Sequence, residues 1–236
     1  MLQGRDPPGL RRSPADAMPT PDYLAPYTDA ARASGARFEA LLWRSREGQI
    51  ARFDAAIRLG RPGGRVVADM GCGLANFNDR LVERGAEHAK YVGVEAIPEL
   101  AEAARARVSQ TGVPASIIEA DFASDGDLFR RLVESEAVDL VVFGGSLNTF
   151  RQRDAVRVLE RAWSALEGVP HGRLVFNFLS DRCEERERRM RTAPAHRFDT
   201  AKMLDWAMRR TPLVAFDQSY LRGHDATVGM TVQPLA

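Results

Sequence analysis

Several features are scarce in this chain of 236 residues, and each scarcity excludes a class of protein. Only two cysteines occur, Cys72 and Cys183, too few for a disulfide framework, so we expect a reducing, cytoplasmic location. No run of about 18 apolar residues occurs, which argues against a membrane span. The N-terminus carries arginines without an apolar stretch behind them, so it does not resemble a secretory signal.

An excess of charge of either sign is also lacking. Lysine and arginine together number 33 and aspartate and glutamate 32, so the formal net charge is +1. This balance argues against a protein that binds nucleic acid by bulk charge. The four histidines are dispersed, with no pair four residues apart and no Cys-x-x-Cys motif, so the sequence predicts no metal site.

Composition divides the chain into three parts. Residues 1–21 contain five prolines and few large apolar side chains, which predicts a disordered tail. Residues 22–63 show a helical spacing of apolar side chains, with Gly48 as the expected break between two helices, and predict an N-terminal helical cap. Residues 64–236 alternate between short apolar runs and amphipathic segments and form the third part.

That alternation predicts the fold class of residues 64–236. Continuous apolar runs separated by helices are typical of a parallel sheet covered on both faces. The last two runs are joined by a short loop over 221–225, so they must pair antiparallel. The sequence therefore predicts an α/β fold, a doubly wound Rossmann-like sheet with an antiparallel pair at one edge. The expected strands are 65–70, 91–94, 116–118, 138–143, 173–179, 213–220 and 226–232.

Ligands of such sheets bind at the carboxyl ends of the strands, and the most informative segment follows the first strand. It reads Asp69-Met70-Gly71-Cys72-Gly73, in which the two glycines permit a tight turn and a close approach of a ligand to the backbone. A dinucleotide-binding motif would continue with glycine or alanine at position 76, where this chain has Asn76. Asp69 places an anion beside the ligand, which favours a cationic ligand over a pyrophosphate.

The next three strands end in groups suited to a nucleoside with a cationic tail. Glu95 ends the second strand, at the spacing where an acidic side chain accepts hydrogen bonds from ribose hydroxyls. Asp121 follows the third strand and can accept from an adenine amino group, while the Phe122 backbone donates to a ring nitrogen. Gly144 follows the fourth strand and exposes its carbonyl to a ligand ammonium.

In these motifs the chain, from about Gly64 onward, resembles the class I S-adenosylmethionine-dependent methyltransferases. The resemblance implies a seven-stranded sheet of order 3-2-1-4-5-7-6, with its last strand antiparallel, and bound S-adenosylmethionine. It departs from many members at Ala75, where they have a third glycine, and at Ile97, where they have a small polar residue. The cofactor-binding residues that it implies are Asp69, Gly71, Gly73, Glu95, Ala96, Asp121, Phe122 and Gly144.

Two further segments have alternative interpretations. The region around Gln49 either caps the cofactor, with Gln49 or a nearby arginine reaching its carboxylate, or packs on the sheet edge with Trp43 in the core. The charged segment over 181–191 either forms a lid that contacts the acceptor through Arg186, Arg189 or Arg191, or is a solvated helix face.

Three residues are candidates for work on the methyl acceptor. Asn148 can hydrogen-bond the acceptor, or it is a turn residue at the start of a helix. His196 and His224 lie in loops, where each can act as a general base near neutral pH or is a surface histidine.

The expected acceptor is a small molecule. The loop over 144–149 lacks the Asn/Asp-Pro-Pro-Tyr/Phe motif of enzymes that methylate nucleic-acid bases or glutamine, so no nucleic-acid partner is expected. A membrane partner is not expected either, and the oligomeric state is not indicated. The alternatives are a protein or RNA methyltransferase, a non-catalytic methyltransferase-like subunit, and an NAD(P)-dependent oxidoreductase, against which Asp69 and Asn76 speak.

Overall fold

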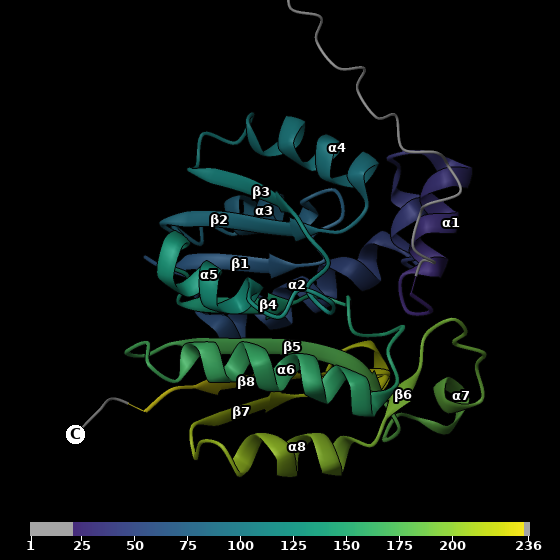
Figure 1. Cartoon of the computed structure of the whole chain (residues 1–236). Helices are drawn as coiled ribbons and strands as arrows, with labels where there is room; N and C mark the ends of the chain where they lie inside the picture. The colour runs from purple at the N-terminus through teal and green to yellow at the C-terminus, as the bar shows by residue number, and fades with distance from the viewer. Residues whose placement is uncertain (1–20, 234–236) are drawn as a thin grey trace, which may run out of the picture.

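The computed structural model describes residues 21–233. The disordered tail expected over 1–21 lies outside the described residues except for Pro21. Figure 1 shows a twisted sheet with helices on both faces, and the segment before the first strand lies partly behind the sheet and partly beyond its strand ends. The strands are β1 (Val66–Met70), β2 (Lys90–Glu95), β3 (Ala115–Glu119), β4 (Leu140–Phe143), β5 (Arg173–Ser180), β6 (Arg197–Phe198), β7 (Val214–Asp217) and β8 (Asp225–Thr231).

The order of the strands in the sheet is β3-β2-β1-β4-β5-β8-β7, and β6 pairs with β5 outside this path. Strands β1 to β5 are parallel, whereas β8 runs antiparallel to both β5 and β7. The expected α/β fold, its strand order and its antiparallel last strand are thus confirmed. The sheet has eight strands rather than seven because Arg197 and Phe198 add a short parallel pair beside Leu179 and Ser180. Two residues are too few to produce a strand pattern in the sequence.

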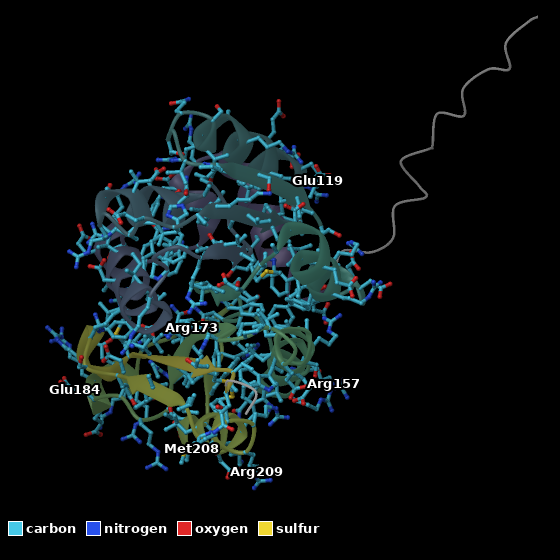
Figure 2. All side chains as sticks on the ribbon, turned by 90° about the vertical axis from the view of Figure 1, so that its left-hand side faces the viewer. Glu119, Arg157, Arg173, Glu184, Met208 and Arg209 are labelled. Carbon is cyan, nitrogen blue, oxygen red and sulfur yellow. The ribbon has the colours of Figure 1, made fainter. Side chains whose placement is uncertain are left out.

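Helices cover both faces of the sheet because successive strand residues point to opposite sides. Ala68 and Met70 of β1 belong to the apolar cluster that also contains residues of α5, α6 and α8, whereas Val67 belongs to the cluster on the other face with residues of α2, α3 and α4. Figure 2 looks at the end where the parallel strands begin, and places Arg173 of β5 between Glu119 of β3 and Met208 of α8. The helices are α1 (Ala25–Ser34), η2 (Phe38–Leu41), α2 (Arg46–Gly60), α3 (Asn76–Glu83), α4 (Pro98–Val108), α5 (Leu128–Glu136), α6 (Gln152–Leu166), α7 (Glu185–Arg188), α8 (Thr200–Met208) and η3 (Leu221–Gly223).

The expected break at Gly48 is wrong. Gly48 lies in the first turn of α2, where its N–H donates to the Oγ of the N-cap residue Ser45 at 3.0 Å. The chain turns earlier, at Gly35 with φ +65° and at Leu42 with φ +55°. A serine that caps the helix start therefore outweighs the low helix propensity of one glycine.

The segment before β1 divides between two places. Helix α2 packs on the sheet through Phe53 and Ala56, which join Val67, Val142 and Val175 in one apolar cluster. Helix α1 and η2 lie instead beyond the carboxyl ends of the parallel strands (Figure 1). We call residues 23–44 the N-terminal cover and residues 190–195, which follow α7, the second cover.

Candidate active site

One cavity of about 420 Å³ lies at the carboxyl ends of β1 to β4, under the two covers. Every cofactor-binding residue expected from the sequence lines it, although these residues come from five separate parts of the chain. The loop after each of the first four strands contributes, and α2 contributes from the N-terminal side. The expected residues in the cavity wall are Gln49, Asp69, Gly71, Gly73, Glu95, Ala96, Asp121, Phe122 and Gly144.

The loop after β1 depends on its two glycines. Gly71 has φ +72°, and a Cβ there would lie 2.7 Å from the Cβ of Ser146 in the loop after β4. Gly73 has φ +55°, and a Cβ there would lie 2.6 Å from a methyl group of Leu41 in the N-terminal cover. Both positions have a left-handed backbone that favours glycine, and at Gly71 the close neighbour is a Cβ that cannot rotate away.

Asp69 is a buried carboxylate at the end of β1. Its side chain accepts a hydrogen bond from the hydroxyl of Tyr91 on β2 at 2.7 Å, and the residue is only 3% exposed. Burial raises the pKa of Asp69 to about 7, the Tyr91 hydrogen bond opposes this rise, and the nearby Glu95 charge adds to it. A cation next to Asp69 would therefore be strongly favoured, because it would replace the missing solvation of the charge.

Glu95 holds the glycine loop and the start of α4 at once. Its Oε2 accepts the Gly73 N–H at 2.8 Å, and its Oε1 accepts the N–H groups of Ala96 and Ile97, each at 3.0 Å. Burial raises the pKa of Glu95, and these three N–H donors lower it in part. Because a carboxylate offers about four acceptor positions, Oε2 retains a free lone pair for a ligand hydroxyl.

Asp121 is held by two donors from different elements. Its Oδ1 accepts the Ala123 N–H at 2.9 Å, and its Oδ2 accepts the hydroxyl of Tyr23 in the N-terminal cover at 2.5 Å. The Tyr23 ring stacks on Phe150, with centroids 4.3 Å apart, and Phe150 stacks in turn on Phe122 at 5.9 Å. The carboxylate thus lies beside aromatic faces, which is a suitable environment for a planar base with an exocyclic amine.

Gln49 reaches the cavity from α2 and is almost fully buried. Its Oε1 accepts from Nδ2 of Asn76 at 3.3 Å, while its Nε2 has no hydrogen-bond partner among the described residues. An unpaired buried N–H group is costly, so Nε2 favours a ligand oxygen in the cavity. Asn76, which replaces the glycine or alanine of a dinucleotide-binding motif, orients this amide.

The covers close the cavity through aromatic and aliphatic contacts. Trp43 packs against Gly145, where a Cβ would lie 2.5 Å from the indole ring, and its ring lies 6.0 Å from that of Phe53. In the second cover, Met190 contacts Arg44 of the N-terminal cover, with 3.4 Å between its Sδ and the guanidinium. The two covers therefore meet over the loops that follow β1 and β4.

The three candidates for work on the acceptor occupy different places. Asn148 and His224 line the cavity, whereas His196 does not and contributes a backbone N–H that donates to the Asn148 carbonyl at 2.7 Å. Burial lowers the pKa of His224. Nδ1 of His224 lies 3.2 Å from the Arg197 guanidinium, which can only donate, and 3.6 Å from Oε2 of Glu187. The closer Arg197 contact favours a neutral ring with its proton on Nε2.

Sequence reasoning missed several residues of the cavity wall. Tyr23 lies in the turn before α1 and Tyr27 in the first turns of that helix, and nothing in the sequence directs either of them to the cavity. Arg52 is buried beside the cavity and forms an ion pair with Asp225 of β8, with 2.5 Å between Nε and Oδ1. A buried arginine on an otherwise amphipathic helix indicates a buried ion pair. The sequence does not identify its partner, which lies 173 residues away in the chain.

The fold is the Rossmann-like fold that methyltransferases share. Residues 67–168 match the family model described as a methyltransferase domain. The chain thus carries a methyltransferase domain, and its fold and motifs agree with those of the class I S-adenosylmethionine-dependent methyltransferases. S-adenosylmethionine is accordingly its cofactor. A comparison with curated proteins finds no match.

Solved structures share the fold at low sequence identity. A methyltransferase from Leishmania major, described as S-adenosylmethionine-dependent, is 14% identical with a TM-score of 0.63, over 89% of this chain and 82% of that one. Magnesium protoporphyrin IX methyltransferase from Synechocystis PCC 6803 is 14% identical with a TM-score of 0.54, over 79% and 83%. A possible exported protein from Bordetella parapertussis is 19% identical with a TM-score of 0.60, over 89% and 78%.

Two further observations concern residues 21–233 only. No helix in this range is both long enough and apolar enough to cross a membrane. Within the same range, no three side chains of histidine, cysteine, aspartate or glutamate are grouped so that they could hold a metal ion.

Proposed function

We propose that the cavity binds S-adenosylmethionine across the ends of β1 to β4 and that the protein transfers its methyl group to a small-molecule acceptor. The observation that carries this proposal is the meeting of three carboxylates, Asp69, Glu95 and Asp121, in the wall of one covered cavity. Each has an orientation fixed by other groups, and each retains acceptor capacity for a ligand.

The cavity fits the cofactor group by group. The buried Asp69 suits the ammonium of the methionine part, and the Gly144 carbonyl in the adjacent loop is a second acceptor for it. Glu95 suits the ribose hydroxyls and Asp121 the adenine amino group, beside the stacked Phe122 and Phe150. The unpaired Nε2 of Gln49 suits the carboxylate of the methionine part.

The cofactor supplies a methyl group on a sulfonium, which an acceptor nucleophile displaces in line. The protein then has to hold the acceptor, exclude water and fix the angle of approach, which can contribute ~7–11 kcal/mol to lowering the barrier. Asn148 Oδ1 and Thr149 Oγ1 are buried at the cavity wall without partners among the described residues, so they are available to orient an acceptor.

The proposed chemistry does not assign a general base to histidine. His224 presents a proton donor at Nε2 when neutral, because its Nδ1 accepts from Arg197. His196 lies outside the cavity wall. An acceptor that is already ionised or has a free lone pair at neutral pH suits such a site, because general-base assistance is then unnecessary.

A small acceptor is favoured over a macromolecule by the covers. Residues from the N-terminal and second covers lie over the strand ends where a protein or RNA segment would have to enter. A ligand cavity of a few hundred cubic ångströms is typical of small-molecule sites. An NAD(P)-dependent oxidoreductase is disfavoured because the buried Asp69 would face a pyrophosphate. The cytoplasmic location stays a prediction.

Calorimetric titration with S-adenosylhomocysteine, the demethylated product, tests the cofactor part. We expect one site per chain and a raised melting temperature. Labelled S-adenosylmethionine mixed separately with small-molecule, protein and RNA fractions of a cell extract tests the acceptor part. Label in the small-molecule fraction is expected, label in protein or RNA would contradict the acceptor class, and the absence of both heat and thermal shift would refute the proposal.

A further inference from the structure

The charges around the cavity are divided between its two sides. The three acidic residues of the wall, Asp69, Glu95 and Asp121, follow β1, β2 and β3. Two arginines of the wall, Arg44 and Arg191, come from the covers. The acidic side suits the cationic cofactor, whereas the other side presents positive charge to whatever lies next to it.

Neither of these two arginines meets a carboxylate among residues 21–233. The Arg44 guanidinium donates to the Sδ of Met190, and Arg191 makes no hydrogen bond or ion pair in the described part of the chain. The remaining wall arginine, Arg52, is already neutralised by Asp225. Two guanidinium groups at a partly enclosed cavity favour an anionic ligand, which can be bound through paired N–H donors.

The two arginines are brought to the same part of the cavity by their neighbours. Arg44 contacts Met190, which directly precedes Arg191 in the chain. His196, which directly follows the second cover, donates its N–H to the Asn148 carbonyl at 2.7 Å. Asn148 therefore lies next to the segment that carries Arg191, so an anion held by the arginines would belong to the molecule that Asn148 orients.

Both arginines are exposed to solvent, and apolar side chains stand next to them in the chain. Trp43 and Met190 lie beside Arg44 and Arg191, and Pro194 belongs to the same cover. A ligand there would bury an apolar body while its anionic group met the guanidinium groups. The cofactor's own carboxylate has a separate donor in Gln49 Nε2, which lies on α2 rather than on a cover.

We infer that the methyl acceptor is a small molecule with an apolar, flat body and an anionic group, carboxylate or phosphate, which Arg44 and Arg191 bind together. This inference rests on the proposed function, because it names the acceptor class of the same site. Of the three arginines that the sequence offers in the charged segment, Arg191 borders the cavity, whereas Arg186 and Arg189 do not.

The test titrates defined probes into the protein saturated with S-adenosylhomocysteine. The probes are a panel of hydroxylated aryl carboxylates and aryl phosphates, each paired with its neutral amide or alcohol, such as 4-hydroxybenzoate, 4-hydroxyphenyl phosphate and 4-hydroxybenzamide. We expect anions to bind about tenfold or more tightly than their neutral partners, since hydrogen bonds to charged groups have that effect. The carboxylate and phosphate arms show which anion is preferred.

The double variant Arg44→Gln/Arg191→Gln is expected to lose this preference, with the ratio of the two dissociation constants falling to within about twofold of unity. Arg188→Gln is the matched control, because Arg188 is exposed in the same charged segment, makes no ion pair in residues 21–233, and does not line the cavity. That control is expected to retain the preference in full. Affinity for S-adenosylhomocysteine is expected to stay within about threefold in all variants.

Each other outcome overturns the inference in a recognisable way. Equal binding of anions and neutral partners, binding of no probe, or an unchanged preference in the double variant overturns the acceptor class alone. A tenfold weaker binding of S-adenosylhomocysteine in the double variant reassigns the arginines to the cofactor. Failure of S-adenosylhomocysteine to bind the unaltered protein overturns the proposed function as well, and it is seen before any probe is added.

Discussion

The two sides of the cavity are built in different ways. On the strand-end side, carboxylates are buried and fixed by the backbone: Glu95 is 6% exposed and accepts three backbone N–H groups. On the cover side, exposed side chains contact one another, as Arg44 contacts Met190, and Leu42 remains 41% exposed. The strand-end side is thus organised before a ligand arrives, whereas the cover side can be altered without changing the sheet.

This difference explains why a common cofactor and a variable acceptor can share one cavity. Groups held by the main chain of a sheet depend on the whole fold and tolerate little change. Side chains on surface segments are tolerant to substitution, so the acceptor end can differ between proteins that share the fold. The variants below test whether the two sides are really independent.

The largest expected effect is on stability and comes from Arg52→Ala. This change leaves Asp225, which is fully buried, without its partner, and an uncompensated buried charge costs about 3–5 kcal/mol of unfolding free energy. Urea denaturation measures it. A loss of unfolding free energy of this size would show that α2 stabilises the sheet and is not part of the N-terminal cover.

Arg58→Ala is the matched control for Arg52→Ala. Arg58 also lies on α2 and pairs with Asp217 of β7, but its side chain is 55% exposed. An exposed pair contributes about 0–1 kcal/mol, so this variant should unfold almost as the unaltered protein does. Equal losses of unfolding free energy in the two variants would show that burial does not decide how much each ion pair contributes to stability.

Asp121→Ala probes the strand-end side, and it also removes the acceptor for the Tyr23 hydroxyl of the N-terminal cover. Removal of an ionised acceptor is expected to weaken binding of S-adenosylhomocysteine by about 1–3 kcal/mol, that is, by about 5- to 150-fold. Isothermal titration calorimetry measures it. Asp125→Ala is the control, because Asp125 lies in the same loop, pairs with Arg131 and does not line the cavity. Unchanged affinity for Asp121→Ala would remove this residue from the site.

The raised pKa of Asp69 predicts a pH dependence of cofactor binding. With a pKa of about 7 in the free protein, Asp69 is protonated below neutral pH and must release a proton to face an ammonium. The dissociation constant for S-adenosylhomocysteine should therefore rise about tenfold for each pH unit below 7 and level off above it. Asp69→Asn should bind more weakly and flatten this dependence, and a slope that persists in the variant would assign the proton elsewhere.

The same shift has a consequence for the protein without ligand. The ordinary pKa of an aspartate is 3.8, so between about pH 4 and 7 the folded protein binds a proton at Asp69 that the unfolded chain does not. Stability contributed by this group consequently falls as the pH rises through that window. Cofactor binding offsets this loss, so the difference in melting temperature between free and bound protein should be larger at pH 8 than at pH 6.

The smallest expected effect is on the local stability of the N-terminal cover, where Tyr23 meets Asp121 of the strand-end side. Tyr23→Phe removes the hydroxyl that donates to Asp121 while it keeps the ring on Phe150. A loss of about 1 kcal/mol should speed amide hydrogen exchange in α1 about fivefold and leave α6 unchanged. If exchange in α1 does not change, this hydrogen bond does not hold the N-terminal cover in place.

The features that could be predicted from the sequence are those that depend on residues close together in the chain. The strands and the strand-end motifs were predictable because each is a local pattern, such as the apolar run before Asp69 or the turn glycines after it. The break placed at Gly48 was wrong because a neighbouring side chain, Ser45, caps the helix there. The short strand β6 was missed because two residues are too few to show the alternation of side chains that is typical of a strand.

The sequence by itself therefore determined the α/β class, the antiparallel pair at one edge and the groups that end the strands, because these are local patterns, whereas the strand order came from the resemblance to a known family. Only the tertiary structure decided what covers the strand ends. Tyr23 meets Asp121 across 98 residues, and Arg44 meets Met190 across 146. Contacts between residues so far apart in the chain depend on how the helices pack on the finished sheet. A local sequence pattern therefore cannot predict them.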